Sequence, residues 1–164
     1  MKKTLLMTKS AVFAALICLA IFIHVPTFNG YVHAGDGLIY TAAMVLPFPY
    51  CIFSAAFGAA LSDVLSGYAI YAIPTFIIKS LNVCCFYFVR DSKKLITKKT
   101  VLVSVLSGVV TTVGYLLTDT ILWGNFTAQL IRTLPGNILQ AAFGTILFIA
   151  LGKVLETSRL GRRI

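Results

Sequence analysis

Long apolar segments alternate along the chain with short stretches that hold most of its charged residues. The apolar segments run roughly over residues 10–27, 37–65, 70–89, 100–118 and 135–152. A helix needs about 20 apolar residues to cross a hydrocarbon core about 30 Å thick, so most of these segments suit one crossing each. The segment 37–65 is longer, and it suits either one tilted helix or two short helices.

The basic residues choose between these alternatives, because cytoplasmic segments of membrane proteins are enriched in lysine and arginine. A turn at Pro47-Phe48-Pro49 would give two helices and would place twelve of the 14 basic residues on the cytoplasmic side, whereas a single helix would leave nine of those twelve outside. We therefore predict an all-α membrane protein with six transmembrane helices and with both termini in the cytoplasm. The expected helices, within one membrane domain of residues 1–164, are about 10–27, 36–47, 50–65, 70–89, 100–118 and 135–153.

The composition supports a multi-pass membrane protein, because 59% of the residues are hydrophobic and only 12% are charged. The net charge of +9 lies in short clusters between apolar segments, so it indicates topology rather than a surface for nucleic acid. The N-terminal segment resembles a secretory signal. However, the candidate cleavage site Val32-His33-Ala34 lies about ten residues beyond the apolar run, so we expect a first membrane helix instead.

The second predicted helix is unusually short. About a dozen residues span about 18 Å at 1.5 Å per residue, which is too little to cross the hydrocarbon core. The outer loop before it must therefore dip inward, and irregular backbone at that depth is tolerated only where protein buries it or where it lines a wet cavity. We expect His33 and Asp36, in this loop, to face such a cavity.

Polar side chains recur at helical spacing on three predicted helices, so each helix presents one polar face. These faces hold Gly108, Thr111, Thr112, Tyr115, Thr118 and Asp119; Thr75, Lys79 and Asn82; and Asn137, Gln140 and Gly144. Pro135 suits the first turn of the last helix, and Thr133 suits its cap.

Such polar groups can simply hold helices together, at about 0.6 kcal/mol each. Ionisable groups inside a membrane helix are costly, however, and by default they mark a pathway or a binding site. Asp63 and Lys79 could form a structural ion pair or contact a ligand. Arg132, with the segment 122–126, could cover an outward cavity or be a solvated side chain.

Motifs for chemistry are missing from the sequence. It contains no G-x-x-x-x-G-K-[ST], no H-E-x-x-H and no G-x-S-x-G, and its four cysteines lack a C-x-x-C pair or neighbouring histidines. We therefore expect neither an enzyme nor a bound cofactor or metal, and the chain has no evident energy source of its own.

Several motifs together resemble a known family. They are the Ala11/Ala15 pair on the first helix, "HAGD" at 33–36, "ALSDVLSGYAIYAIPTFIIKSL" at 60–81 and "LPGNILQAAFG" at 134–144. In this order and spacing they are similar to the substrate-binding S components of energy-coupling factor (ECF) vitamin transporters, and the similarity covers nearly the whole chain.

The resemblance implies a mechanism in the bacterial plasma membrane. The subunit would capture a micronutrient at the outer surface, dock onto a transmembrane T component with two ABC-type ATPases, and topple to release the substrate inside. The face of Ala11 and Ala15 would be the docking surface, and the loop after the first helix would be a lid that His33 and Asp36 anchor or from which they touch substrate.

Amides and aromatic rings on the polar faces suit a flat, largely uncharged nitrogen heterocycle, such as a thiamine-type pyrimidine, a flavin or a queuosine precursor. A stand-alone facilitator or ion-coupled carrier, with Asp63, Lys79 and Asp119 as a relay, is the alternative; an intramembrane enzyme is a more distant one. The candidate substrate-binding residues are His33, Asp36, Tyr40, Lys79, Asn82, Tyr115, Asp119, Trp123, Asn125, Asn137 and Gln140.

Overall fold

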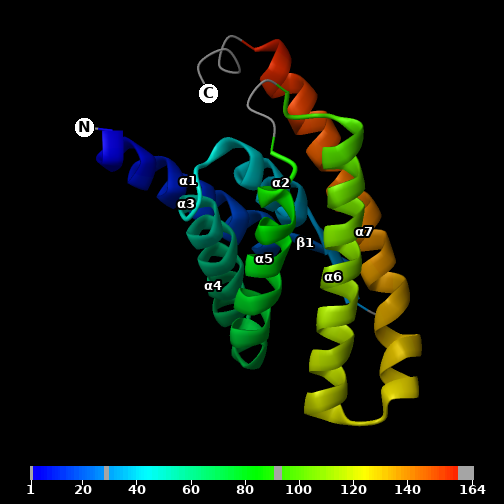
Figure 1. Ribbon diagram of the computed structural model, residues 1–164. Coiled ribbons are helices and arrows are strands. Elements are labelled where there is room, and N and C mark those ends of the chain that lie inside the picture. Colours follow the sequence, from blue (N-terminus) through cyan, green and yellow to red (C-terminus); the bar gives the residue numbers. More distant parts are fainter. Residues whose placement is uncertain (1, 28–29, 91–93, 159–164) are drawn as a thin grey trace.

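The structure is a computed structural model that describes residues 2–27, 30–90 and 94–158, and most of these residues are helical (Figure 1). A two-stranded ribbon follows the first helix. In chain order the elements are α1 (Lys2–Phe22), β1 (His24–Thr27), β2 (Gly30–His33), α2 (Gly35–Val45), α3 (Tyr50–Ile52), the π-helical turn η1 (Phe53–Phe57), α4 (Gly58–Leu65), the 3-10 turn η2 (Ala69–Tyr71), α5 (Ala72–Tyr87), α6 (Lys98–Trp123) and α7 (Phe126–Thr157).

The described helical segments form six helices, because α3, η1 and α4 run on without interruption and η2 leads into α5. Four of the six are long and apolar enough to cross a membrane, namely Lys3–Phe22, Ala69–Tyr87, Lys98–Trp123 and Phe126–Thr157. The helix Tyr50–Leu65 is apolar but shorter. The chain is therefore a multi-pass membrane protein.

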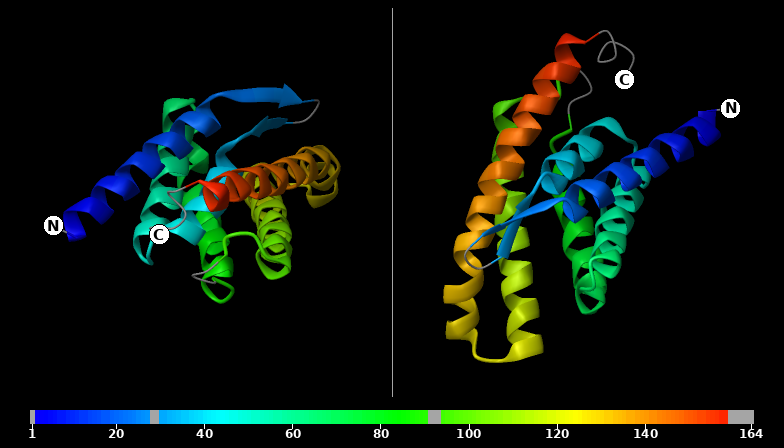
Figure 2. Two further views of the ribbon diagram at one scale, coloured as in Figure 1. Left: turned by 90° about the horizontal axis from the view of Figure 1, so that it is seen from above. Right: turned by 180° about the vertical axis from the view of Figure 1, so that it is seen from behind.

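The segment after α1 differs from the expected helix at 10–27 and the dipping loop. Helix α1 ends at Phe22, and His24–Thr27 pairs antiparallel with Gly30–His33. Hydropathy alone extended the predicted helix to residue 27. Pro26 has no backbone N–H, so it cannot donate the hydrogen bond that a continued helix needs. The ribbon reaches from the end of α1 across to α7 (Figure 2).

The last helix also differs, because it begins at Phe126 rather than near 135. Asn125 caps it by accepting a hydrogen bond from the Ala128 N–H at 3.1 Å. Pro135 therefore lies inside the helix, not in its first turn. Two residues before it, the Thr133 hydroxyl donates to the Gln129 carbonyl instead of capping the helix start. Membrane helices tolerate such a proline, because side chains and neighbouring helices satisfy the freed backbone groups.

Helix α2 forms the centre of the protein. Nine of its 11 residues are buried, and it packs against α1, α5 and α7. Tyr40 stacks on Phe86 of α5, and both rings lie against Phe148 of α7 in edge contact. At the C-terminal end of α2, the Arg90 guanidinium donates to the carbonyl of the C-cap residue Leu46 at 2.7 Å.

The two ends of the helices are distinct in Figure 1. The start of α1, the end of α7 and the start of α6 lie at one end of the molecule, and the α4–α5 and α6–α7 turns lie at the other. This arrangement matches a bundle in which consecutive long helices run in opposite directions.

Small residues let α1 and α4 approach closely. A Cβ atom added to Gly58 would lie 2.5 Å from the Ala14 carbonyl oxygen, which is backbone and cannot rotate away. Gly58→Ala should therefore lower the free energy of unfolding by about 1–3 kcal/mol through overpacking, measured by thermal unfolding in detergent.

Gly114→Ala is the matched control. Its added Cβ would meet side-chain atoms of Ile78 and not backbone, so the loss should be smaller. Equal stability of the wild type and Gly58→Ala would contradict the close packing of α1 on α4.

Candidate substrate-binding site

A cavity of about 510 Å³ lies where the ribbon meets the ends of α4, α5, α6 and α7. The two strands, α4 and the turn after it, η2, α5, α6 and α7 supply its aromatic, hydroxyl, amide and charged side chains. The lining residues are His24, Pro26, Tyr31 and His33; Asp63 and Tyr68; Tyr71, Thr75 and Lys79; Thr111, Tyr115, Asp119 and Trp123; and Arg132, Thr133, Gly136, Asn137 and Gln140.

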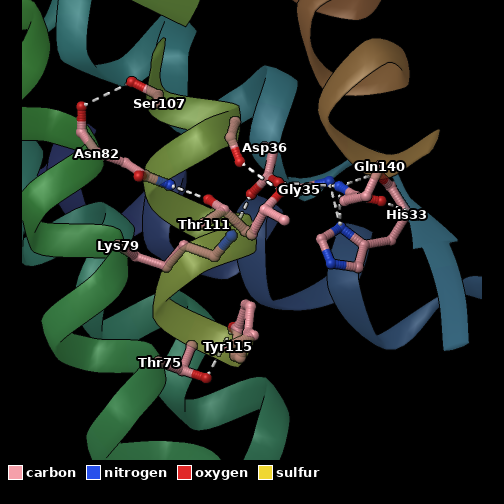
Figure 3. A network of polar contacts seen from close by, with 12 residues as sticks. His33, Gly35, Asp36, Thr75, Lys79, Asn82, Ser107, Thr111, Tyr115 and Gln140 are labelled. Atoms are coloured by element: carbon pink, nitrogen blue, oxygen red, sulfur yellow. Dashed lines mark hydrogen bonds and ion pairs between the residues drawn. The ribbon is translucent and has the colours of Figure 1, made fainter. Parts of the chain in front are cut away.

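A buried ion pair lies at one side of this cavity. Lys79 Nζ of α5 is 2.6 Å from Asp36 Oδ1 of α2, and both side chains are almost fully buried. The ammonium also lies 5.6 Å from the centre of the Tyr115 ring, within cation–π range. This pair joins α2 to α5 beside the cavity (Figure 3).

Gln140 of α7 connects the ion pair to the ribbon. Its Nε2 donates to Asp36 Oδ2 at 3.0 Å and to the His33 carbonyl at 3.1 Å, and its Oε1 accepts from the His33 N–H at 2.9 Å. One side chain thus holds both main-chain groups of His33 and the free carboxylate oxygen of the pair (Figure 3). Sequence analysis predicted Gln140 as a substrate contact, and the structure shows it engaged by protein groups.

His33 lies in β2, outside the membrane-spanning helices, and is 9% exposed. Burial lowers the pKa of this histidine to about 4, so its ring is neutral at pH 7. A neutral ring leaves Nδ1 free to accept a hydrogen bond from the Gly35 N–H at 3.2 Å. The side chain of His33 thereby fixes the turn between β2 and α2.

The opposite wall is built from paired hydroxyl groups. Thr75 and Tyr115 hydrogen bond at 2.9 Å, Tyr71 donates to Asp119 Oδ1 at 2.7 Å, and Trp123 Nε1 donates to the Tyr71 hydroxyl at 3.0 Å. These contacts join α5 and η2 to α6, so the wall is held in place without a ligand.

Aromatic rings cluster at the mouth of the cavity. The Tyr31 ring of β2 lies 4.4 Å from the His24 ring and 6.3 Å from the Tyr68 ring, measured between centroids. Tyr68 and Trp123 are 47% and 59% exposed, so their faces are open to a ligand or to solvent. Flat rings on two sides of an opening suit a flat ligand.

Seven of the predicted site residues line the cavity: His33, Lys79, Tyr115, Asp119, Trp123, Asn137 and Gln140. Four do not. Asp36 lies behind Lys79, Tyr40 is stacked in the core, Asn82 donates to Thr111 between α5 and α6 at 2.8 Å, and Asn125 caps α7.

Sequence reasoning assigned no binding role to the tyrosines at positions 31, 68 and 71, all of which line the cavity. Tyr31 lies in β2, and Tyr68 and Tyr71 lie in the turn after α4 and in η2, where helical spacing gives no signal. Arg132, left open between a cover and a solvated side chain, lines the cavity and is exposed. The possible ion pair of Asp63 with Lys79 is not formed, because Lys79 pairs with Asp36.

Breaking the ion pair should destabilise the fold. Lys79→Met leaves the Asp36 carboxylate uncompensated in the interior, and such a loss typically costs about 3–5 kcal/mol. The double variant Lys79→Met with Asp36→Leu removes both charges and should recover most of that loss, as thermal unfolding in detergent can measure. A double variant less stable than Lys79→Met alone would contradict this account.

Comparisons with known proteins identify a relative and a family of this chain. A Pyrococcus woesei protein described as "Uncharacterized protein in gap 3'region" is 28% identical over 141 residues, which cover 82% of this chain and 93% of that protein. The family model of the ECF-type riboflavin transporter, S component, matches residues 1–157. The resemblance inferred from the sequence motifs is thereby confirmed: the chain belongs to the S-component family of ECF-type riboflavin transporters, a family of transporter subunits and not of enzymes.

Proposed function

We propose that this chain is the substrate-capture subunit of an ATP-driven ECF-type importer. It binds a small, flat, nitrogen-containing vitamin or precursor in the cavity between the ribbon and helices α4 to α7. The observation that carries the proposal is the cavity itself, which combines aromatic rings with paired and unpaired polar groups. Its volume of about 510 Å³ lies within the range usual for small-molecule sites.

Riboflavin is the first ligand to test, because the family takes its description from a riboflavin transporter. A flavin ring system can stack between Tyr31, Tyr71 and Trp123, and its ring edge can pair with the Asn137 amide. A thiamine-type pyrimidine and a queuosine precursor share the flat ring and the polar edge, and they remain the other candidate ligands.

The proposed topology has six crossings in one membrane domain, with both termini in the cytoplasm of a bacterial-type cell and the cavity open to the outside. Twelve of the 14 basic residues belong to the two termini and the segment 90–99. Helix α2 is too short to cross alone, and this is compatible with a membrane fold because protein surrounds it.

The ribbon acts as a lid over the cavity in this proposal. Gln140 binds both main-chain groups of His33, so it positions the lid and does not itself need to touch the substrate. Asp36 has the same supporting role through Lys79. Asn137, Tyr115, Asp119 and Trp123 are the proposed substrate contacts among the predicted residues.

The proposed partners are a transmembrane T component and two ABC-type ATPases, because the chain carries no nucleotide-binding motif. Ala11 and Ala15 are exposed on α1, whereas Ala14 and Cys18 on its other side are buried against the protein. An exposed stripe of small residues lets another helix approach closely. Transport by reconstituted vesicles that lack ATPases would favour the ion-coupled carrier instead.

Ligand binding tests the proposal directly. Trp123 is the single tryptophan and lines the cavity, so its fluorescence should change when riboflavin, the aminopyrimidine 4-amino-5-hydroxymethyl-2-methylpyrimidine or a queuosine precursor binds. Asn137→Ala should weaken binding about five- to 150-fold, the cost of an unpaired buried partner, as measured by calorimetry.

Ile138→Ala is the matched control, because Ile138 follows Asn137 on α7 but is 54% exposed and does not line the cavity. Its dissociation constant should equal that of the wild type. The same constant for Asn137→Ala would move the binding site away from this turn of α7.

Docking can be separated from binding. Ala15→Trp should abolish ATP-driven uptake by the reconstituted complex and leave the ligand dissociation constant unchanged, because a large ring prevents close approach to α1. Ile146→Trp, on an exposed position of α7, should retain uptake. Normal uptake by Ala15→Trp would show that the partner docks elsewhere.

A further inference from the structure

Asp63 differs from Asp119, the other acidic residue that lines the cavity, in its hydrogen bonds. It lies on α4, lines the cavity and is only 5% exposed. Among the residues that the structure describes, no donor hydrogen bonds to its Oδ2. A buried carboxylate oxygen without a donor is unfavourable, and each such group in a folded protein calls for an explanation.

The Thr75 hydroxyl beside Asp63 hydrogen bonds with the Tyr115 hydroxyl at 2.9 Å, and two other donors of the cavity are engaged with other carboxylates. Lys79 donates to Asp36 at 2.6 Å, and the Tyr71 hydroxyl donates to Asp119 at 2.7 Å. Both of those carboxylates therefore have a protein partner. Asp63 lines the same cavity and its Oδ2 has no such partner, so a molecule in the cavity can supply a donor to this carboxylate.

The backbone fixes where this carboxylate lies. The Asp63 carbonyl accepts a hydrogen bond from the Tyr68 N–H at 2.8 Å, and the Ser62 carbonyl accepts one from the Ser66 N–H at 2.9 Å. These bonds close the last turn of α4 and the turn that follows it. Asp63 is thus held in position before any ligand arrives, which lowers the cost of ordering it on binding.

We propose that Asp63 accepts a hydrogen bond from a ring N–H or an amino group of the substrate and thereby selects heterocycles that carry such a donor. This inference rests on the proposed function and narrows its substrate class. A site that loses its hydrogen-bond partner leaves a buried polar group unpaired, so an analogue without the donor is rejected strongly.

Matched ligand pairs test this role. Riboflavin is compared with 3-methylriboflavin, and the aminopyrimidine is compared with its 4-dimethylamino analogue, because each methylated form lacks the ring N–H or amino donor. The wild type should bind the parent roughly ten- to 150-fold more tightly than the methylated form, the range for a hydrogen bond to a charged group.

Asp63→Ala should bind the two members of that pair with nearly equal affinity, and Asp63→Asn, whose amide oxygen still accepts a hydrogen bond, should keep part of the preference. Glu156→Gln is the matched control, since it alters a carboxylate that has its own donors, the Leu95 and Ile96 N–H groups, and that does not line the cavity; it should keep the wild-type ratio. Thermal unfolding in detergent verifies that each variant is folded.

The outcomes separate the two proposals. If the wild type binds a parent but Asp63→Ala retains the same preference over the methylated form, the role of Asp63 is overturned and the capture function stands. If the wild type binds neither parent, the proposed substrate class is overturned and the role of Asp63 with it. A preference lost in Asp63→Ala and kept in Glu156→Gln supports the inference.

Discussion

A lysine ammonium and an aspartate carboxylate in contact inside an apolar bundle constrain much of the architecture. Neither group tolerates burial alone, so Lys79 on α5 and Asp36 on α2 must stay together. The short central helix α2 is therefore attached to a long helix by charge as well as by packing. Gln140 adds α7 to the same carboxylate and joins the ribbon to it through the main chain of His33.

This arrangement places polar groups where the membrane would otherwise exclude them. The first residues of helix α2 are buried within the protein, beside the ion pair. The strand before it satisfies its backbone partly through β1 and partly through the Gln140 side chain. The cavity lies beside these elements, and hydrogen bonds within the protein hold several of its lining side chains in position.

The sequence predicted the membrane class, the division into six helices and the polar faces of the helices, because these follow from hydropathy, charge and helical spacing. It did not predict the ribbon, since an apolar run that contains a proline still scores as helix-compatible. The sequence also did not predict the ion-pair partner of Lys79. Asp36 is 43 positions away in the chain, and only the packing of α2 against α5 brings the two together.

The same limit explains the side chains that changed role. Asn125 and Asn82 carry amides that suit a ligand, but a cap and a contact between helices use them. Spacing along a helix tells which residues share a face, and it does not tell whether a neighbouring helix already fills that face. The tyrosines of the ribbon and of the turn before α5 lie outside regular helices, where spacing gives no signal.

Gln140 uses the donor and the acceptor of its amide at the same time, and this restricts what can occupy its position. A glutamate of the same size would have no N–H for the His33 carbonyl, and it would bring a second negative charge to within about 3 Å of the Asp36 carboxylate. A methionine of similar length would leave the His33 N–H without its acceptor. Glutamate and methionine therefore each lose a hydrogen bond to His33, so few side chains other than glutamine can satisfy both main-chain groups at this position.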